Sequence, residues 1–388
     1  MARLDEIFDL QMGKTPSRNN ADYWTDGQYN WVSIADLGTY QKYVEDTKEK
    51  ISASAIQGSG IKSVPANTVI MSFKLSLGKT AITQEPVYTN EAIMAFIPTG
   101  KYAVLPDYFY YLFSANDWTK DTNRAVMGTT LNKATLGAVS ITVPPFDEQR
   151  KIAAVLDKVS SLIAKRRQQL DKLDEMVKAR FVEMFGDTIY NPYNWPTQQL
   201  EEMADIVSGI TKGRKTKEQD LIEVPYMAVS NVKDGYIDWT TVKTILATQS
   251  EVEQYRLLPD DILMTEGGDP DKLGRGAIIQ TPPENCIHQN HIFRVRLNEK
   301  LLLPCYFAEF LKHQKAKQYF LRCAKQTTGI ASINMRQLKG LTTLVPPLEL
   351  QNQFATFVEH TEKTKTTISR SLEKLETLKK ALMQEYFG

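Results

Sequence analysis

Two long segments of the chain repeat apolar residues at intervals of three and four positions. The first segment follows Pro145 and carries Ile152, Val155, Leu156, Val159, Leu162, Ile163, Leu170, Leu173, Val177, Phe181 and Met184. The second carries Phe354, Phe357, Val358, Ile368, Leu372, Leu375, Leu378, Leu382 and Tyr386. Such spacing places the apolar side chains along one face of an α-helix. Each segment is predicted to be a helix of about 38 residues, roughly 57 Å long at 1.5 Å per residue.

The first segment also has the residues expected at helix ends. Asp147 and Glu148 fall in its first turn, where negative charge complements the helix dipole, and Gly186 is a natural stop. A helix of this length with one apolar stripe needs a partner along that stripe. The other long segment is the simplest partner, which predicts an antiparallel coiled coil. The alternative is that each helix packs only on its own globular domain.

Shorter runs before each long helix favour strands. They lie at residues 29–34, 68–72 and 92–96 in the first half of the chain, and at residues 226–229, 261–264 and 291–295 in the second half. A proline in the first turn favours helices over residues 106–114 and 304–323. The predicted fold class is therefore α+β, with two mixed α/β domains joined by two long helices.

The chain is an internal repeat. The Val-Pro-Pro sequences that begin at Val143 and Val345 are separated by the same 202 residues as Gly186 and Gly388. Upstream, with small gaps, residues 4–7 parallel residues 200–203, and residues 105–109 parallel residues 303–307. The globular parts differ more than the helices, which suggests one scaffold that carries two different recognition domains. The predicted domains are a recognition domain at residues 1–146, a central spacer helix at 147–186, a second recognition domain at 187–348 and a C-terminal spacer helix at 349–388.

Composition sets limits on location and chemistry. The 388 residues suit two or three domains. The sequence contains no apolar run of 18 or more residues, so no membrane-spanning helix is predicted. The first residues lack the apolar core of a signal peptide, and the three cysteines form no C-x-x-C pair, which argues against a zinc site or a disulfide framework. We expect a cytoplasmic protein. The net charge of +1 is not that of a typical nucleic-acid binder, so any DNA binding needs local positive charge or charge from partners.

Four short patterns resemble catalytic motifs but lack a required element. The sequence 76–80 ends like a phosphate-binding loop, yet Phe73 stands where glycine is needed, so a hairpin turn is favoured. Residues 266–272 offer carboxylates for a nuclease, but their Gly, Pro and Asp content predicts a loop. His288 and His291 would face opposite sides of a strand. Residues 191–194 lack the second proline of an adenine methyltransferase motif. We therefore predict no catalytic residue and no metal site.

Four segments follow the pattern of a known family, namely residues 12–18, 23–24, 31–37 and 143–153. The first three resemble the opening of a target recognition domain, and the last resembles the junction between such a domain and its helix in the specificity subunits of type I restriction–modification systems. Together with the repeat, the resemblance covers nearly the whole chain. The second copy departs from the pattern, because residues 209–213 lack the Thr-Pro pair and residues 348–353 lack the basic residues.

The resemblance implies a subunit that binds DNA sequence-specifically and has no catalysis of its own. Each domain would read half of a bipartite site through the major groove, with a non-specific gap between the halves. The helices would act as spacer and as docking surface for two methyltransferase subunits, and a restriction and translocase subunit would join them. S-adenosylmethionine would bind the partner methyltransferases, so no cofactor is expected in this chain. The polar middles of the helices, residues 165–169 and 363–367, are either a solvated face or a contact with partners or with DNA backbone.

Polar loop residues are the candidates for DNA contact, since Arg and Lys suit guanine edges and phosphates while Asn and Gln suit adenine. In the first domain the candidates are Lys14, Thr15, Ser17, Arg18, Lys74, Ser76, Lys79, Thr129, Asn132 and Lys133. In the second they are Lys212, Arg214, Lys215, Lys272, Arg275, Gln289, Asn290, Gln326, Thr327, Ser332, Asn334 and Arg336. We expect about a third of them to touch DNA.

Two other functions fit part of the pattern. A scaffold protein with two binding domains on a coiled coil, and no DNA, is favoured by the low net charge. A self-sufficient methyltransferase is opposed by the missing glycine-rich cofactor motif. Salt-dependent DNA binding in the presence of the methyltransferase subunit separates the first alternative from a specificity subunit.

Overall fold

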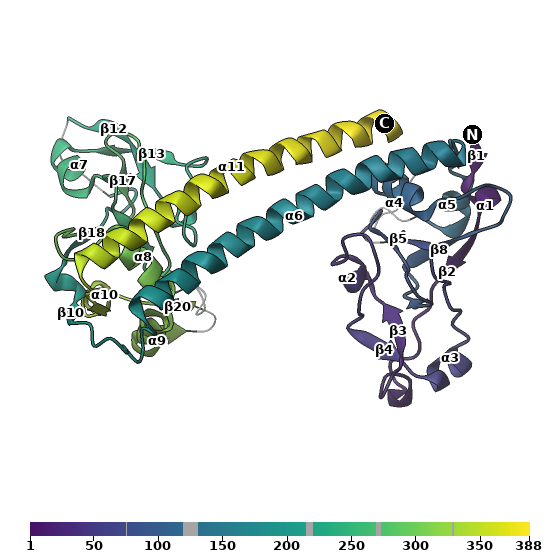
Figure 1. Ribbon diagram of the computed structural model, residues 1–388, viewed down its shortest axis with the longest axis horizontal. Coiled ribbons are helices and arrows are strands. Elements are labelled where there is room, and N and C mark those ends of the chain that lie inside the picture. Colours follow the sequence, from purple (N-terminus) through teal and green to yellow (C-terminus); the bar gives the residue numbers. More distant parts are fainter. Residues whose placement is uncertain (75, 119–130, 215–219, 269–272, 328–329) are drawn as a thin grey trace. The chain divides into compact units, whose positions relative to one another are not determined.

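The computed structural model describes residues 1–74, 76–118, 131–214, 220–268, 273–327 and 330–388, with the backbone alone for residues 326, 327 and 330. The chain divides into two compact units (Figure 1). The first consists of Met1–Arg167 and Arg370–Gly388, and the second of Gln168–Ser369. Each unit holds one globular domain, the beginning of one long helix and the end of the other.

The first domain is built on two small sheets. A four-stranded antiparallel sheet has the strand order β2-β8-β5-β6, and a three-stranded sheet has the order β4-β3-β7, in which β3 and β7 are parallel. The strands are β1 Ala2–Arg3, β2 Phe8–Met12, β3 Tyr29–Val32, β4 Glu49–Ile51, β5 Val69–Ser72, β6 Thr80–Ile82, β7 Tyr88–Thr89, β8 Ile93–Pro98 and β9 Ser140–Ile141. The helices are α1 Leu4–Ile7, η1 Ala21–Tyr23, α2 Ile34–Leu37, α3 Ala53–Ser59, α4 Pro106–Ala115 and α5 Lys133–Ala138.

The second domain repeats this plan. Its four-stranded sheet has the order β11-β18-β14-β16, and its three-stranded sheet has the order β13-β12-β17, with β12 and β17 parallel. The strands are β10 Thr197–Gln199, β11 Ala204–Ser208, β12 Ile222–Met227, β13 Lys243–Ala247, β14 Ile262–Thr265, β15 Gly267–Gly268, β16 Gly276–Ile278, β17 Ile287–His288, β18 Ile292–Leu297, β19 Lys325–Thr327, β20 Ile330–Ser332 and β21 Thr342–Leu344. The helices are η2 Leu200–Glu202, η3 Val229–Asn231, α7 Gln249–Tyr255, α8 Pro304–Lys312, α9 Gln314–Cys323 and α10 Met335–Lys339.

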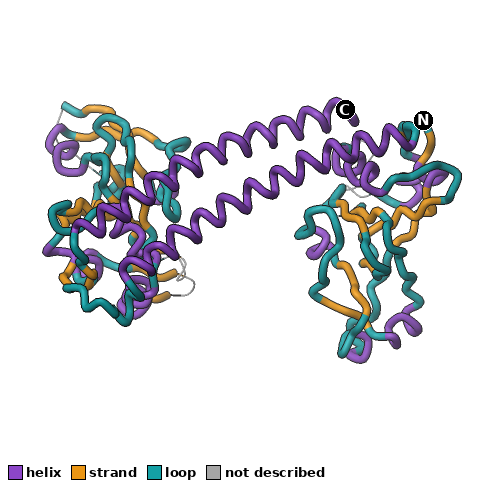
Figure 2. The backbone as a smooth tube through the Cα atoms, viewed as in Figure 1, coloured by secondary structure: helices purple, strands orange, loops and turns teal. Residues whose placement is uncertain are grey.

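The mixed strand and helix content of both domains confirms the predicted α+β class (Figure 2). The predicted hairpin turn is also present, because β5 and β6 pair antiparallel on either side of residues 76–79. Two predictions for the second domain are wrong. The helix expected over residues 304–323 is interrupted at His313, whose backbone is extended and whose ring stacks on Phe181 with 4.4 Å between centroids. The segment expected to be a loop contains strand β15, which pairs with β20 at Ser332.

The two long helices are α6, Phe146–Phe185, and α11, Leu348–Phe387. Within each unit they run antiparallel, as the apolar stripes predict. In the first unit Arg167 forms an ion pair of 2.6 Å with Glu376, and in the second Lys365 forms one of 2.9 Å with Asp174. Both cations belong to the polar middles of the helices. Their side chains therefore contribute to helix pairing, beyond lining a solvated face.

Each unit buries parts of both helices in one core. In the first unit Ile152 and Leu156 of α6 belong to the domain's main core, and Leu382 and Tyr386 of α11 pack against it. The helices thus pack on a domain and on each other at the same time. The alternative in which each helix contacts only its own domain is wrong, since Leu382 and Tyr386 of α11 pack against the first domain.

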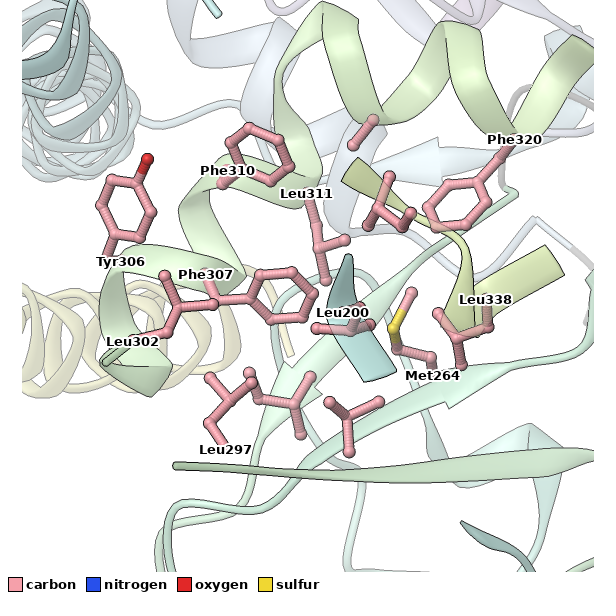
Figure 3. Packing of buried hydrophobic residues seen from close by; sticks show 14 of the residues in the cluster. Leu200, Met264, Leu297, Leu302, Tyr306, Phe307, Phe310, Leu311, Phe320 and Leu338 are labelled. Carbon is pink, nitrogen blue, oxygen red and sulfur yellow. The ribbon is translucent and has the colours of Figure 1, made fainter. Parts of the chain in front are cut away.

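The core of the second unit is rich in aromatic side chains. Figure 3 shows Tyr306, Phe307 and Phe310 of α8 packed with residues from the sheet and from the loops around it. Phe181 of α6 stacks on Tyr306 and meets Phe354 of α11 edge to face, with centroids 5.3 and 5.5 Å apart. The side chain of Phe181 is fully buried. One ring therefore joins both long helices to the globular domain.

A buried glutamine holds the start of each long helix to its domain. Gln149 accepts a hydrogen bond from the Leu105 backbone N–H at 2.9 Å, and its amide donates to the carbonyl oxygens of Ala103 and Pro144, each at 2.9 Å. In the second domain Gln351 makes the corresponding three bonds, to Leu303 at 2.8 Å, Leu301 at 3.1 Å and Pro346 at 2.8 Å. Both side chains are 0% exposed. The Val-Pro-Pro junctions are thus conserved between the copies as a hydrogen-bonded joint.

We expect Gln351→Leu to lower the free energy of unfolding of the second unit by about 2–4 kcal/mol, because it leaves one buried backbone donor and two carbonyls without their partner. Gln353→Leu, at an exposed position of the same helix, is the matched control and should change the free energy by less than about 0.5 kcal/mol. Urea unfolding followed by circular dichroism measures both. Equal midpoints for the two variants would show that the joint does not stabilise the unit.

Candidate nucleic-acid interface

Backbone hydrogen bonds tie four separate segments of the first domain together. The N–H of Lys14 donates to the carbonyl of Thr89 at 2.8 Å. The N–H of Phe73 donates to the carbonyl of Ala92 at 3.0 Å, and the N–H of Leu131 donates to the carbonyl of Phe73 at 3.3 Å. The segments that meet here follow β2, β5 and β7 or precede α5. Many of the residues predicted to contact DNA lie on them.

The second domain has the same three bonds at equivalent positions. The N–H of Ile210 donates to the carbonyl of His288 at 3.0 Å. The N–H of Glu266 donates to the carbonyl of His291 at 3.0 Å, and the N–H of Ile333 donates to the carbonyl of Glu266 at 2.8 Å. We call these segments the recognition surface. It comprises residues 13–18, 73–74, 90–92 and 131–133 in the first domain and residues 209–214, 266–268, 289–291 and 332–336 in the second.

A glycine permits the closest approach in each copy. A Cβ atom on Gly13 would lie 2.2 Å from the carbonyl oxygen of Thr89, and one on Gly209 would lie 1.9 Å from that of His288. No side chain fits at such distances, so only glycine allows the two segments to meet. The three backbone bonds and the close approach at glycine therefore recur in both domains, whereas the side chains differ.

In the first domain the recognition surface carries a chain of polar contacts. The Thr15 hydroxyl donates to the Glu91 carboxylate and accepts from the Asn90 amide at 3.3 Å. Arg18 pairs with Glu49, with 2.8 Å between Nη2 and Oε2, and its guanidinium lies 3.7 Å from the centroid of the Trp24 ring. This arrangement presents hydroxyl, amide and carboxylate groups side by side.

In the second domain a different set of groups occupies the same backbone. The Asn290 amide lies 3.3 Å from Nε2 of His291, and Nδ1 of His291 lies 2.6 Å from the Glu266 carboxylate. Gln289 accepts from the N–H of Val229 at 3.2 Å through its side-chain oxygen. Pairing of β15 with β20 at Ser332 brings this predicted residue next to Glu266. Asn290, His291 and Glu266 thus form one chain of contacts, and Ser332 lies on the strand that pairs with the residue after Glu266.

Two of the predicted arginines on this surface, Arg18 and Arg214, are held by carboxylates of their own domain. Arg214 pairs with Glu251 through Nε and Oε1 at 2.6 Å, as Arg18 pairs with Glu49. The hydrogen bond from Arg214 lowers the pKa of Glu251, and that from Arg18 lowers the pKa of Glu49. The carboxylates therefore stay charged near neutral pH and compensate the arginines. The predicted Lys14 and Lys212 are exposed, and the Lys14 amine donates to the carbonyl of Ser59.

The other predicted residues fall into three groups. Lys74, Ser76 and Lys79 lie on or beside the β5–β6 turn, with Lys79 Nζ close to Gly38. Asn132 and Asn334 accept the backbone N–H of the third residue of α5 and α10 and so cap these helices. The remaining residues of this set, Ser17, Lys133 and Arg336, are exposed.

Arg275 is set apart, because it lines a pocket together with Lys178, Glu309 and His313 instead of the recognition surface. Gln326 and Thr327 lie in β19, for which only the backbone is described. Thr129, Lys215 and Lys272 lie outside the described residues. All the DNA contacts stay predictions; the structure shows only where the described candidate residues lie.

Sequence reasoning missed Glu91, Glu266 and His291. The residues predicted to contact DNA are basic, amide and hydroxyl side chains and include no acidic residue, although Asp and Glu accept hydrogen bonds from cytosine. His291 was considered only as a metal ligand. The repeat could have indicated Glu91. It lies two residues before β8, and the predicted Asn290 lies two residues before β18.

Two structural features bear on other functions. Across the described ranges, no group of three or more His, Cys, Asp or Glu side chains is placed to hold a metal ion. None of the helices in the described part of the chain has the length and apolar character required to cross a lipid bilayer.

The duplicated domain, each copy followed by a long helix and each carrying its own polar surface, defines a protein with two separate recognition sites. The family described as "Type I restriction modification DNA specificity domain" matches residues 1–174 and 192–377. The chain therefore belongs to the family of type I restriction–modification specificity subunits, as its sequence motifs predict.

Known relatives agree with this family. The chain is 23% identical over 379 residues to the type I restriction enzyme MjaIX specificity subunit of Methanocaldococcus jannaschii, covering 92% of this chain and 85% of that protein. It is 20% identical over 274 residues to the EcoKI specificity subunit of Escherichia coli, covering 66% of this chain and 59% of the relative.

Among solved structures, the fold is similar to that of the type I S subunit from M. genitalium, with a TM-score of 0.58 at 14% identity, covering all of this chain and 95% of the other. A chain from a structural study of type I complex assembly and conformational transition has a TM-score of 0.61 at 16% identity, with coverage of 100% and 96%. At these identities the comparison concerns the fold alone.

Proposed function

We propose that this chain reads a bipartite DNA sequence, with each domain recognising one half through its recognition surface. The observation that carries the proposal is that the two surfaces share one backbone arrangement and present different side chains. The first offers Thr15 and Glu91, and the second offers Asn290 and His291. Base edges in the major groove are distinguished by the pattern of donors and acceptors that they meet, so different side chains on one frame select different sequences.

The long helices are proposed to dock two methyltransferase subunits. Val155 and Leu162 lie seven residues apart on α6 and are 41% and 39% exposed, although they belong to the apolar repeat of that helix. Apolar residues at heptad spacing favour packing against another helix. Because the chain is a repeat, we propose one methyltransferase for each unit, and a restriction and translocase subunit that joins the assembly in the cytoplasm.

The proposed role is recognition without catalysis. The partners would bind S-adenosylmethionine and perform methyl transfer, while this chain would bind no cofactor and would determine where they act. We expect the purified chain alone to transfer no methyl group from radiolabelled S-adenosylmethionine to DNA and to leave supercoiled DNA uncut. Methyl transfer by the isolated chain, at a rate that follows its concentration through further purification, would contradict this role.

DNA binding by the chain together with its methyltransferase subunit tests the proposal most directly. We expect one DNA sequence to bind at least about a thousandfold more tightly than random DNA at the same salt concentration. The logarithm of the association constant should fall linearly with the logarithm of salt concentration, by about 0.9 per phosphate contact. A complex without sequence preference or salt dependence would favour the alternative, a scaffold protein that binds no DNA.

A further inference from the structure

One position of the recognition surface differs between the two domains in hydrogen-bonding character. Residue 91 follows β7 by two positions and residue 290 follows β17 by two positions. Both are flanked by the same backbone bonds, described above. The first domain has a glutamate here, whose carboxylate only accepts hydrogen bonds, and the second has an asparagine, whose amide both donates and accepts. Because the backbone hydrogen bonds are shared, a substitution at this position changes the hydrogen-bonding groups of the side chain without changing the backbone arrangement.

The amide of Asn290 is held in one orientation by its neighbours. Nδ1 of His291 faces the Glu266 carboxylate at 2.6 Å, and a carboxylate accepts only, so Nδ1 carries the proton. The NH2 group of Asn290 lies 3.3 Å from Nε2, to which it donates when the imidazole is neutral. In the described part of the chain the amide makes no other hydrogen bond. Among the described residues, one N–H and the side-chain carbonyl oxygen of Asn290 have no hydrogen-bond partner.

A free amide N–H beside a free amide oxygen is the pair of groups that recognises adenine, whose N7 accepts and whose N6 donates in the major groove. The exposed fractions fit this role, because the side chains of His291 and Glu266 are 57% and 34% exposed and Asn290 is half-buried. The backbone of Asn290 is held on both sides. Its N–H donates to Ile210 at 3.0 Å, and its carbonyl accepts from the Ser208 hydroxyl.

Glu91 is held by a similar chain of side chains in the first domain. The Thr15 hydroxyl donates to one carboxylate oxygen of Glu91, and the same hydroxyl accepts from Asn90 at 3.3 Å. The hydroxyl proton is therefore directed at Glu91. A carboxylate in the major groove accepts from the N4 amino group of cytosine and has no donor for the N7 atom of a purine.

We propose that Asn290 reads an adenine in one half of the site and that Glu91 reads a cytosine in the other, with His291 positioning Asn290. The inference rests on the proposed function and makes it specific at two residues. Neither the Asn290 nor the Glu91 side chain belongs to a core. The hydrogen bonds that join the segments of the recognition surface are made by backbone groups, so neither side chain is needed for them.

The experiment uses the full chain assembled with its methyltransferase subunits and a DNA library in which every base pair of the site is varied. Binding followed by sequencing gives the preference for each base at each position. The variants are Asn290→Ala and Glu91→Ala. The matched controls are Asn298→Ala and Glu45→Ala, at exposed positions of the same domains outside the recognition surface.

We expect Asn290→Ala to reduce the preference for adenine at one base pair by about 5- to 150-fold and to leave the other positions unchanged. Glu91→Ala should do the same for cytosine at one base pair of the other half. His291→Ala should weaken the adenine preference at the position affected by Asn290→Ala, without changing the salt dependence of binding. A merely structural role of His291 would lower binding to all sequences equally.

Unchanged base profiles in both alanine variants would overturn the inference while leaving a sequence-specific complex intact. An equal loss at every position would overturn it as well. A wild-type complex without any base preference would instead contradict the proposed function itself. Should Asn290→Ala lower the unfolding temperature, Asn290→Asp keeps the shape of the side chain and removes both N–H donors, so the same loss of adenine preference is required of it.

Discussion

Replacing residues 1–142 with the equivalent domain of a relative is expected to change one half of the recognised DNA sequence and leave the other half unchanged. The first domain has its own core and its own recognition surface, so its side chains are exchanged as a set. The exchanged segment contains both partners of the β1–β9 pair and ends before the joint at Gln149. Because specific sites bind at least about a thousandfold more tightly than other DNA, the preferred sequence should change completely in that half.

The matching exchange of residues 187–344 is the control, and it should alter the opposite half alone. Sequencing of methylated sites in cells that express each hybrid with the same methyltransferase measures both halves at once. A hybrid that folds and methylates, but in which both halves change together, would rule out two independent recognition domains. The donor domain must also accept Leu382 and Tyr386 of α11, which pack against the core of the first domain.

Phe181→Ala is expected to lower the free energy of unfolding of the second unit by about 3–5 kcal/mol, the range for removing a fully buried aromatic ring. The ring is 0% exposed and contacts Tyr306, His313 and Phe354, which belong to three different parts of the unit. Its removal leaves a cavity that none of these elements fills alone. Thermal unfolding followed by circular dichroism, together with urea titration, measures the loss.

The neighbouring Val182 supplies the control, because it lies on the same helix and is 44% exposed. Val182→Ala should change the free energy of unfolding by less than about 0.5 kcal/mol. If both substitutions had the same small effect, Phe181 would not be the residue that joins the long helices to the second domain. A lower unfolding temperature for the second unit with an unchanged base profile in the first half of the site would show that the two units are stabilised separately.

The sequence alone was enough to predict the large elements and the duplication. A three-four apolar repeat over some forty residues has no alternative to a helix, because every turn repeats the signal, and α6 and α11 begin within a residue or two of the predicted starts. The hairpin at residues 76–79 was predictable from local turn chemistry. The family was predictable as well, since the motif at residues 143–153 and the repeat are both properties of sequence order.

Tertiary structure decided the features that depend on residues far apart in the chain. The helix is interrupted at His313, whose ring stacks on Phe181, more than a hundred positions away in the chain. Gly267 and Gly268 are strand residues because β20 pairs with them. Local propensity contains no information about either partner.

The candidate site also shows which features the sequence predicts and which the tertiary structure decides. The sequence indicated Thr15 and Asn290 as polar loop residues, but their neighbours came from other segments, and only the fold brought Glu266 to His291 and Thr15 to Glu91. Hydrogen bonding between side chains requires an approach of about 3 Å. That approach is set by backbone segments which glycines at positions 13 and 209 allow to touch. The sequence by itself determined two copies of a domain on paired helices, and the three-dimensional contacts decided which donors and acceptors each copy presents.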